Sequence, residues 1–195
     1  IVGNVNPAQA NAELCNLIAS TLLECGLETD QFIINVSNRK IIQGIIKDLK
    51  IPDTKQTKVM RAIDKLDKPG FGLRGVEDLL KKERKDKSGA ITKGANLNDD
   101  QVSKILDFLK INDLNKLKQN FKNPLTQEGI KELEDLLEIL KFGNYSGQIK
   151  TNFTIVRGLA YYDGFCVETN LSFKAKNNKG KDVDIGSICS GGQYN

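Results

Sequence analysis

The sequence predicts an α+β fold in which a sheet-containing core is interrupted by a helical block. A β-branched run at about 31–37 lies between two helical patterns, strand patterns disappear between about 47 and 147, and they return from 148 onward. A chain of 195 residues is long enough for one domain that carries a sizeable insertion. We therefore predict a first part of the core at 1–49, a helical insertion domain at 50–147 and a second part of the core at 148–195.

The first core element is an amphipathic helix. Asn6 followed by Pro7 is typical of an N-cap and a first helical position. The residues that recur at helical spacing before Gly26 are Leu14, Leu17, Ile18, Thr21 and Leu22. This pattern predicts a helix with one face toward the core.

A strand and a second helix follow. Phe32, Ile33, Ile34 and Val36 make the 31–37 run β-branched and apolar, which predicts a buried strand. Asn38 is placed to cap the next helix, whose apolar stripe consists of Ile41, Ile42, Ile45, Ile46 and Leu49. Pro52 is expected to end it.

The insertion is expected to be all helical. Thr54 can cap a helix through Asp67, and Pro69-Gly70 breaks it. Further helices are predicted at 74 to about 85, 98–110 and 126–142, the last ending against Gly143. The stripe in that last helix is expected to face the core, with a partner groove as the alternative: Leu133, Leu136, Leu137 and Leu140.

Strand patterns return in the last part of the chain. They cover about 148–156, 163–175 and 182–190, with a turn at 177–180 between the last two. These segments complete the predicted core.

Composition excludes several classes of protein. Hydrophobic residues make up 39% and charged residues 28% of the chain, and no run of eighteen apolar residues could cross a membrane. The start, Ile1-Val2-Gly3, lacks an initiator Met and the features of a secretion signal. We expect a cytoplasmic protein and a chain cut out of something longer.

Histidine is absent, and the four cysteines show no C-x-x-C spacing. A mixed zinc site and nucleophiles activated by histidine are therefore excluded, and no metal ligands are assigned. Cys166 and Cys189 lie in apolar stretches, which favours buried, inert thiols. Any catalysis must depend on positioning and electrostatics.

Positive charge is concentrated in one segment. Residues 47–122 contain nineteen Lys and Arg against twelve Asp and Glu. A cluster within this segment is a candidate contact for an RNA phosphate backbone: Lys81, Lys82, Arg84, Lys85, Lys87 and Lys93. The alternative is a solvated helix end, because acidic residues are interspersed.

Three features near the end of the chain together predict a small-molecule site. Arg157 could bind a phosphate or carboxylate, and Tyr161 and Tyr162 would point to opposite faces of a strand. Gly191-Gly192 would let a ligand approach the backbone. Taken singly, each has an ordinary explanation: a surface arginine, a packing pair and a plain turn.

The same residues carry a resemblance to a known family. Residues 157–164, Arg-Gly-Leu-Ala-Tyr-Tyr-Asp-Gly, and 190–195, Ser-Gly-Gly-Gln-Tyr-Asn, resemble two histidine-specific motifs of the histidyl-tRNA synthetases, which are class II aminoacyl-tRNA synthetases. Residues 35–40, 63–67 and 83–94 are similar to further stretches of the family, the last to the insertion of its bacterial members. The resemblance covers the whole chain and is strongest to the alphaproteobacterial form.

The resemblance implies a set of roles. Arg157 would contact the α-phosphate of ATP while the carboxylate of histidine attacks it. Tyr162 would hydrogen-bond the substrate imidazole, Tyr161 would shape its pocket, and Gly191, Gly192 and Tyr194 would close around it. The sheet would be part of the family's antiparallel catalytic sheet, and the insertion would pack over the acceptor stem of tRNA(His).

Departures from the family pattern remove charge at three positions, where Ala160, Gln193 and Asn195 replace Asp, Arg and Asp. The chain also begins after the second class II motif and stops before the third. ATP is then a substrate of a parent protein whose Mg²⁺ ligands lie elsewhere, and which the family implies is a homodimer. We expect this segment alone not to aminoacylate.

Two other functions remain open. The synthetase-like regulatory subunit of ATP phosphoribosyltransferase resembles the same core and binds histidine without charging tRNA; the helical block is expected to distinguish the two. A generic helical RNA-binding protein would leave Arg157, Tyr162 and the glycine pair unexplained.

Overall fold

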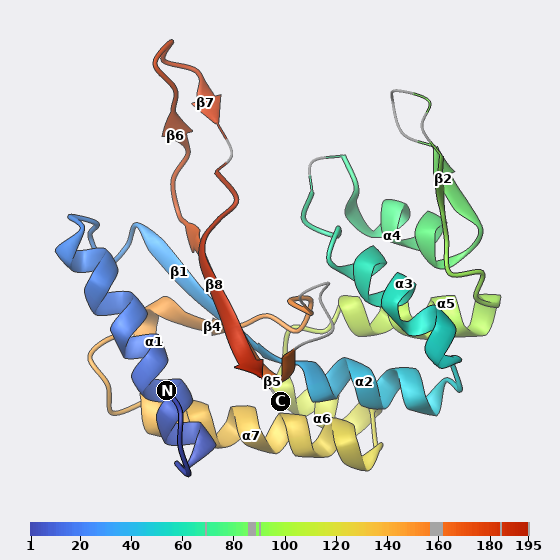
Figure 1. Cartoon of the computed structure of the whole chain (residues 1–195), viewed down its shortest axis with the longest axis horizontal. Helices are drawn as coiled ribbons and strands as arrows, with labels where there is room; N and C mark the ends of the chain where they lie inside the picture. The colour runs from blue at the N-terminus through green and yellow to red at the C-terminus, as the bar shows by residue number, and fades with distance from the viewer. Residues whose placement is uncertain (69, 86–88, 90, 157–161, 184, 195) are drawn as a thin grey trace.

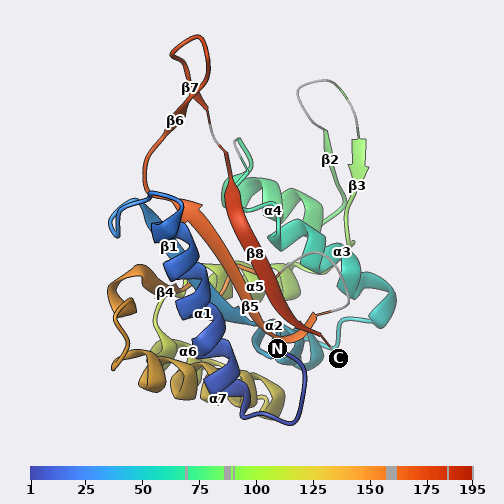
Figure 2. The same ribbon diagram turned by 60° about the vertical axis from the view of Figure 1, so that its left-hand side comes forward.

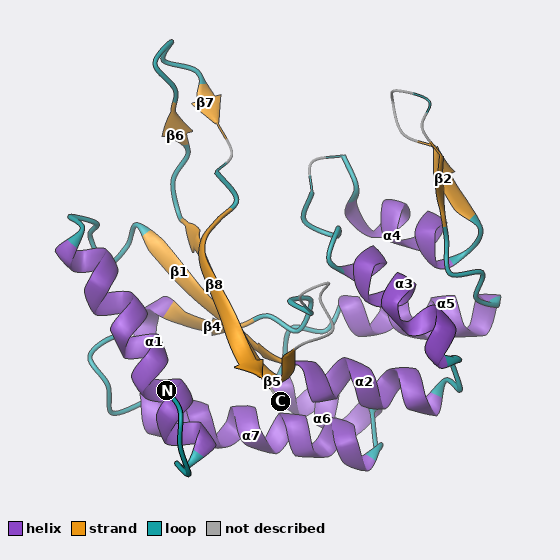
Figure 3. Ribbon diagram, viewed as in Figure 1, coloured by secondary structure: helices purple, strands orange, loops and turns teal. Residues whose placement is uncertain are grey.

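The computed structural model describes residues 1–68, 70–85, 89, 91–156, 162–183 and 185–194 (Figure 3). Its helices are α1 (Pro7–Glu24), α2 (Arg39–Asp48), α3 (Asp53–Ile63), α4 (Gly72–Leu80), α5 (Asp99–Leu109), α6 (Leu114–Asn120), α7 (Pro124–Leu140) and the 3-10 turn η1 (Ser146–Gln148). Its strands are β1 (Phe32–Asn38), β2 (Glu83–Lys85), β3 (Ile91–Lys93), β4 (Ile149–Thr151), β5 (Tyr162–Leu171), β6 (Ala175–Lys176), β7 (Asp182–Val183) and β8 (Ser187–Tyr194).

Four strands form a central sheet in the order β4-β1-β5-β8 (Figure 1). β1, β5 and β8 are antiparallel neighbours, and β4 runs parallel to β1. The predicted α+β class is confirmed. The sheet is mixed, however, because the chain returns to the β1 edge only after the long helical excursion and enters it in the same direction as β1.

One face of the sheet is apolar and covered. Ile34 and Val36 of β1 lie opposite Thr169 and Val167 of β5, and all four residues are buried. The same hydrophobic cluster contains Cys15 and Ala19 of α1 and Leu133 of α7. In Figure 2, α1 crosses in front of the sheet. α1 and α7 therefore cover this face of the sheet.

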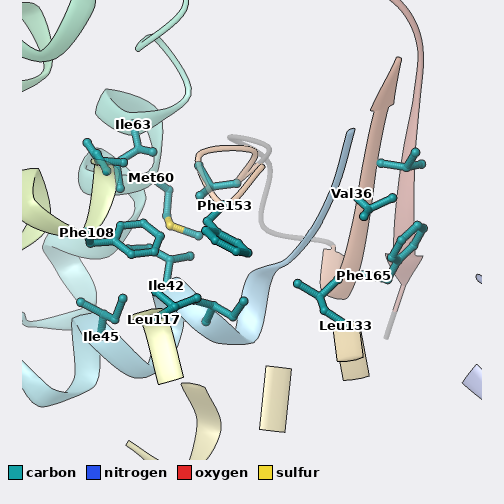
Figure 4. Packing of buried hydrophobic residues seen from close by; sticks show 14 of the residues in the cluster. Val36, Ile42, Ile45, Met60, Ile63, Phe108, Leu117, Leu133, Phe153 and Phe165 are labelled. Carbon is teal, nitrogen blue, oxygen red and sulfur yellow. The ribbon is translucent and has the colours of Figure 1, made fainter. Parts of the chain in front are cut away.

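The core continues without a break from the sheet into the helical block. Ile42 and Ile45 of α2 belong to the same buried cluster as Met60, Ile63 and Phe108. Figure 4 shows these side chains converging, with Phe153 beside Met60. α7 contacts α1, α2, β1 and β5. The division into domains at 49/50 and 147/148 stays a prediction.

The predicted caps at Asn6 and Asn38 are confirmed. Asn6 Oδ1 accepts from Ala8 N at 3.0 Å, and Asn38 Oδ1 accepts from Lys40 N at 3.0 Å. Asn98 forms a reciprocal capping box with Gln101 at the start of α5. Each cap satisfies backbone donors that the first turn leaves unpaired, typically worth about 1 kcal/mol.

Two predicted helix starts were wrong by one turn or less. α3 begins at Asp53 after Pro52, not at a Thr54 cap, and α7 begins at Pro124, not at 126. Asn123 caps α7 through Leu125 N, and the fixed φ of Pro124 suits the first helical position. α6 is a helix for which no prediction was made.

The expectation of an all-helical insertion was wrong at residues 83–85 and 91–93, which form the hairpin β2–β3. The helix predicted to reach about residue 85 ends at Leu80. The carbonyls of Leu79 and Leu80 accept hydrogen bonds from Ala95 and Leu97 at 2.8 and 3.0 Å. The returning chain therefore occupies the two carbonyl oxygens that a longer helix would pair with the backbone N–H groups of its own next turn.

The last strands differ in length from the prediction. The predicted strand at 148–156 is a strand only at 149–151, because Phe153 and Val156 are buried in the core without a partner strand in the described sheet. β5 and β8 occupy 162–171 and 187–194. The predicted turn at 177–180 is confirmed between β6 and β7. Across the described helices, none is long and apolar enough to span a membrane.

Candidate functional site

The structure brings three of the predicted histidine-site residues together. Tyr162 of β5 lies opposite Tyr194 of β8, and their ring centroids are 5.1 Å apart with planes tilted by 59°. Tyr162 is buried at 7% exposure, whereas Tyr194 is 65% exposed. One ring of the pair is therefore in a desolvated setting and the other faces outward. Arg157, Tyr161, Ala160 and Asn195 lie outside the described residues.

A side chain at Gly191 and one at Gly192 would point to opposite faces of the sheet. A Cβ on Gly192 would lie 2.7 Å from Tyr162 Cδ1 and 2.9 Å from the Phe165 carbonyl oxygen, closer than real contacts allow. A Cβ on Gly191 would meet only Val167 Cγ1, at an ordinary 3.7 Å. The Tyr162 ring therefore requires glycine at 192, and nothing comparable requires it at 191.

Polar side chains line part of the sheet face opposite α1 and α7. Register places Asn35, Glu168 and Ser190 side by side across β1, β5 and β8. Asn35 Nδ2 donates to Asn170 Oδ1 at 3.0 Å, and Asn170 Nδ2 reaches Glu168 Oε1 at 3.5 Å. We call these four residues the polar row. Sequence reasoning missed the row, although the alternation of Asn35 with Ile34 and Val36 in a strand was a signal for it.

Arg39 is a second functional-site candidate that sequence reasoning did not single out. It follows the Asn38 cap directly at the start of α2 and is only 6% exposed. Burial lowers the pKa of its guanidinium, while the electrostatic effects of Cys166 and Asp163 act in the opposite direction. Because an arginine stays charged even so, the Tyr162 end of the sheet carries a buried positive charge.

A cavity of about 550 Å³ joins the polar face to the helical block. Glu168, Asn170 and Ser187 line it from the sheet. Asp64, Asp67 and Lys68 line it from the segment that follows α3, and Thr154 and Ile155 from the segment after β4. A second cavity of about 580 Å³ lies beside Gly192 and Tyr194 against the N-terminal segment. Glu168 and Asn170 of the polar row thus border the first cavity, and Gly192 and Tyr194 border the second.

The cysteines differ in burial: Cys15 and Cys166 are buried, Cys189 is half-buried where a buried thiol was predicted, and Cys25 is exposed. All four are free, and burial raises the pKa of Cys15 to about 12. Cys166 packs with Tyr162 and Ile155 in a small buried cluster. Within the described ranges, no group of three or more Cys, Asp or Glu side chains could hold a metal ion.

The basic cluster divides into two groups. Arg84 lies with its Cζ 3.9 Å from the Phe71 ring centroid, and its Nη2 donates to the Gly70 carbonyl at 2.9 Å. Lys81 Nζ lies 2.9 Å from Glu77 and 3.4 Å from Asp99, and the hydrogen bond to Glu77 raises its pKa. The exposed members are Lys82, Lys85 and Lys93, and Lys87 lies outside the described residues.

The charge pattern around Arg84 indicates a structural contact. Its Nη1 is also 3.9 Å from Asp78 Oδ2, and a Cβ on Gly75 would come within 2.0 Å of that nitrogen. The guanidinium thus fills the space that glycine leaves on α4 and ties β2 to the turn before that helix. It is less available to RNA than the sequence suggested.

Comparison with known proteins gives a consistent result. A protein-family model described as histidyl-tRNA synthetase matches residues 1–195. Histidine–tRNA ligases from Pelagibacter ubique and Rhizobium meliloti are 80% and 39% identical, over 100% and 95% of this chain. The chain spans about two fifths of the length of these relatives, 42% and 38%.

Solved structures show the same fold. A histidyl-tRNA synthetase from Nostoc sp. matches 98% of the chain and 41% of its own, with a TM-score of 0.73 and 26% identity. An ATP phosphoribosyltransferase regulatory subunit/histidyl-tRNA synthetase from Bacillus halodurans matches 98% of the chain and 44% of its own, with a TM-score of 0.69 and 17% identity. An ATP phosphoribosyl transferase (HisG:HisZ) complex from Thermotoga maritima matches 96% and 56%, with a TM-score of 0.59 and 16% identity.

Proposed function

We propose, because the chain belongs to the histidyl-tRNA synthetase family, that it forms part of a histidine–tRNA ligase. The full-length protein would join histidine to ATP, giving histidyl-adenylate and pyrophosphate, and then transfer the histidyl group to tRNA(His). The 80% identity to a curated ligase over the whole chain is the observation that carries this proposal. Its place in translation is our reason for assigning it to the cytoplasm.

The amino-acid pocket is proposed around Tyr162, with Gly192 and Tyr194. The family resemblance implies a hydrogen bond between the Tyr162 hydroxyl and the substrate imidazole, and the burial of Tyr162 beside Tyr194 supports a pocket at this place. Tyr161 and Gly191 would shape the pocket from the neighbouring positions. The close approach of the Gly192 backbone to Tyr162 supports this arrangement.

Arg157 is proposed to stabilise the transition state of adenylate formation. Negative charge develops on the α-phosphate as the histidine carboxylate attacks, and a fixed cation there lowers the barrier more than it strengthens binding of the ground state. Within this mechanism the chain's own residues bind the amino acid and neutralise charge. The described residues contain no group of three or more Cys, Asp or Glu side chains that could hold Mg²⁺.

Contact with tRNA is proposed at the β2–β3 hairpin through Lys82, Lys85 and Lys93, with Lys81 and Arg84 nearby. Lys87 is a further candidate that lies outside the described residues. The three exposed lysines favour electrostatic contact with phosphates and no reading of bases. We also propose that the full-length protein is a homodimer, as the family resemblance implies.

The regulatory subunit of ATP phosphoribosyltransferase is the second candidate. Structures named for that function align with 96–98% of the chain, so the helical block does not by itself separate the two functions. Their identities of 16–17% show the fold alone, whereas the ligase relative is 80% identical. Sequence therefore favours the ligase.

The test is pyrophosphate exchange with ATP in a full-length ligase that carries this segment, built in the framework of the Pelagibacter ubique relative. We expect exchange that depends on histidine, followed by charging of tRNA(His), and no exchange by residues 1–195 alone. Histidine binding without exchange or charging would instead support the regulatory subunit.

A further inference from the structure

A second hairpin projects from the core, formed by residues 172–186 with β6 and β7; we call it the β6–β7 arm. It connects β5 to β8 but lies outside the four-stranded sheet, as its own two-stranded unit. Figures 1 and 2 both show it extending away from the body of the molecule. Its described residues are exposed apart from Ala175, which is half-buried. The core does not need this excursion in order to pair β5 with β8.

The tip of the arm is organised by Asn177. Asn177 Oδ1 accepts from Lys179 N at 2.9 Å and from Lys181 N at 3.1 Å. Its backbone accepts from Gly180 N and donates to the Lys181 carbonyl, each at 2.9 Å. Gly180 has φ of +72°, which a glycine adopts without strain. The tip is therefore a hydrogen-bonded turn, which fixes the backbone positions of Lys179 and Lys181.

Positive charge exceeds negative charge in the arm, whose sequence contains four lysines against Asp182 and Asp184. Lys174, Lys176, Lys179 and Lys181 are all exposed, and none takes part in an ion pair within the part of the chain that the structure describes. By contrast, lysines on α5, α6 and α7 pair with nearby carboxylates. These four ammonium groups are therefore available to an external anion.

The base of the arm connects this charge to the candidate site. Ile185, Gly186 and Ser187 line the 550 Å³ cavity together with the end of α3. α3 contacts α4, and α4 contacts β2. In both views the arm and the β2–β3 hairpin project toward the same side of the molecule (Figures 1 and 2). Two basic hairpins thus stand on either side of the cavity.

We propose that the β6–β7 arm is a second RNA-binding element, which holds the phosphate backbone of the tRNA substrate opposite the β2–β3 hairpin. The inference rests on the proposed ligase function for the identity of the RNA. Charge complementarity favours RNA, since four exposed lysines in a short arm match a polyanion. Phe173, Val183 and Ile185 are 36–53% exposed and line a hollow of the arm. A protein contact at that hollow is the alternative that the test below separates from RNA binding.

The test compares two sets of lysine variants in the full-length ligase that carries this segment. The arm variant is Lys174→Ala, Lys176→Ala, Lys179→Ala and Lys181→Ala. The control removes the same charge from α6, α7 and their flanks, distant from the arm in Figure 1: Lys118→Ala, Lys122→Ala, Lys131→Ala and Lys141→Ala. Binding of a tRNA(His) transcript is measured from low to high salt, together with KM for tRNA and pyrophosphate exchange.

The arm variant should bind the transcript at least about tenfold more weakly near 0.1 M salt. Its salt slope should fall by roughly 0.7–0.9 for each phosphate that the arm no longer neutralises. KM for tRNA should rise while histidine-dependent pyrophosphate exchange, which needs no RNA, stays unchanged. A second variant that replaces 174–183 by Asn-Gly should reproduce this effect, because it leaves all four strands of the central sheet in place.

Unchanged affinity and salt slope would overturn the inference, as would an equal loss of affinity in the control. A change of oligomeric state without a change in RNA binding would overturn it in favour of a protein interface. If the unsubstituted protein neither exchanges pyrophosphate nor charges tRNA, the proposed function fails. In that case, weaker transcript binding by the arm variants would still support the arm as an RNA-binding element.

Discussion

At the residue scale, Gly192 is the best-defined constraint on the candidate site. Sequence analysis treated Gly191 and Gly192 as one motif, because two adjacent glycines look alike in a sequence. The structure separates them, since neighbouring residues of a strand point to opposite faces. Only position 192 lies against Tyr162 and the Phe165 carbonyl.

Gly192→Ala should therefore impair histidine binding far more than Gly191→Ala. The added methyl group must displace the Tyr162 ring and a backbone oxygen, and such overpacking typically costs about 1–3 kcal/mol. We expect KM for histidine in pyrophosphate exchange to rise about tenfold or more for Gly192→Ala, and to stay within about twofold for Gly191→Ala. Equal effects of the two substitutions would contradict the assignment of Gly192 to the Tyr162 face.

Arg84 shows why charge alone misleads at this scale. In the sequence it is one of six cations in a basic cluster, and all six look available to RNA. In the structure its guanidinium lies over Phe71 and binds the Gly70 carbonyl. Burial and stacking depend on a turn ten or more residues away, which no local pattern predicts.

At the scale of elements, the β2–β3 hairpin depends on tertiary contacts. Each strand has three residues, and the segment from Glu83 to Lys93 lacks the apolar alternation that signals a strand. The hairpin is fixed by the Arg84 contacts and by the hydrogen bonds from residues 94–97 to the end of α4. Sequence reasoning therefore extended the preceding helix to about residue 85, over β2.

Arg84→Lys separates the structural role of this residue from its charge. Lysine keeps the positive charge but loses the planar stacking on Phe71 and the fork of donors. We expect faster hydrogen exchange of the amides in 83–85 and 91–93, with a local loss on the order of 1 kcal/mol, in line with a partly exposed cation–π contact. Lys85→Ala, at an exposed neighbouring position, is the control.

The control should leave amide protection in the hairpin unchanged and weaken transcript binding. If Arg84→Lys left amide protection unchanged and Lys85→Ala reduced it, the hairpin would be stabilised by Lys85 and not by Arg84.

Strong patterns gave the right elements elsewhere. Asn6-Pro7 predicted α1, the β-branched run at 31–37 predicted β1, and Asn38 with the apolar stripe that follows it predicted α2. Local signals and core packing agree in these elements. The segment 152–156 looks like a strand but packs beside α3 through Phe153 (Figure 4). β-branched and aromatic residues fit a buried surface with or without a ladder. Sequence alone could not distinguish the two outcomes.

At the scale of the whole molecule, one hydrophobic core joins the sheet to the helical block. The insertion was predicted from a change in pattern along the chain, but its helices contribute to the same buried cluster as α1, α2 and the strands. The polar face of the sheet, the cavity at the end of α3 and the two basic hairpins then lie around a common region. That arrangement could not be derived from spacing, because it depends on how β8 returns beside β5.

The candidate site was predictable only in part, because some of its residues meet only through the pairing of strands. The resemblance to the synthetase family pointed to Tyr162, Gly192 and Tyr194, and the structure brings these residues together. Arg39 and the polar row become visible only when β1 and β5 are placed in register. Motifs identify residues that are close in the chain, whereas this site also draws on residues more than a hundred positions apart.

The most direct test of the central claim is the effect of Arg157→Ala on histidine activation by a full-length ligase carrying this segment. Removing a cation that acts on the transition state should lower the rate and leave ground-state binding intact. We predict that histidine-dependent pyrophosphate exchange falls by at least about a hundredfold while the Kd for histidine changes by less than about threefold. An equal loss in rate and in histidine affinity would contradict the transition-state role, and an unchanged rate would contradict the proposed site altogether.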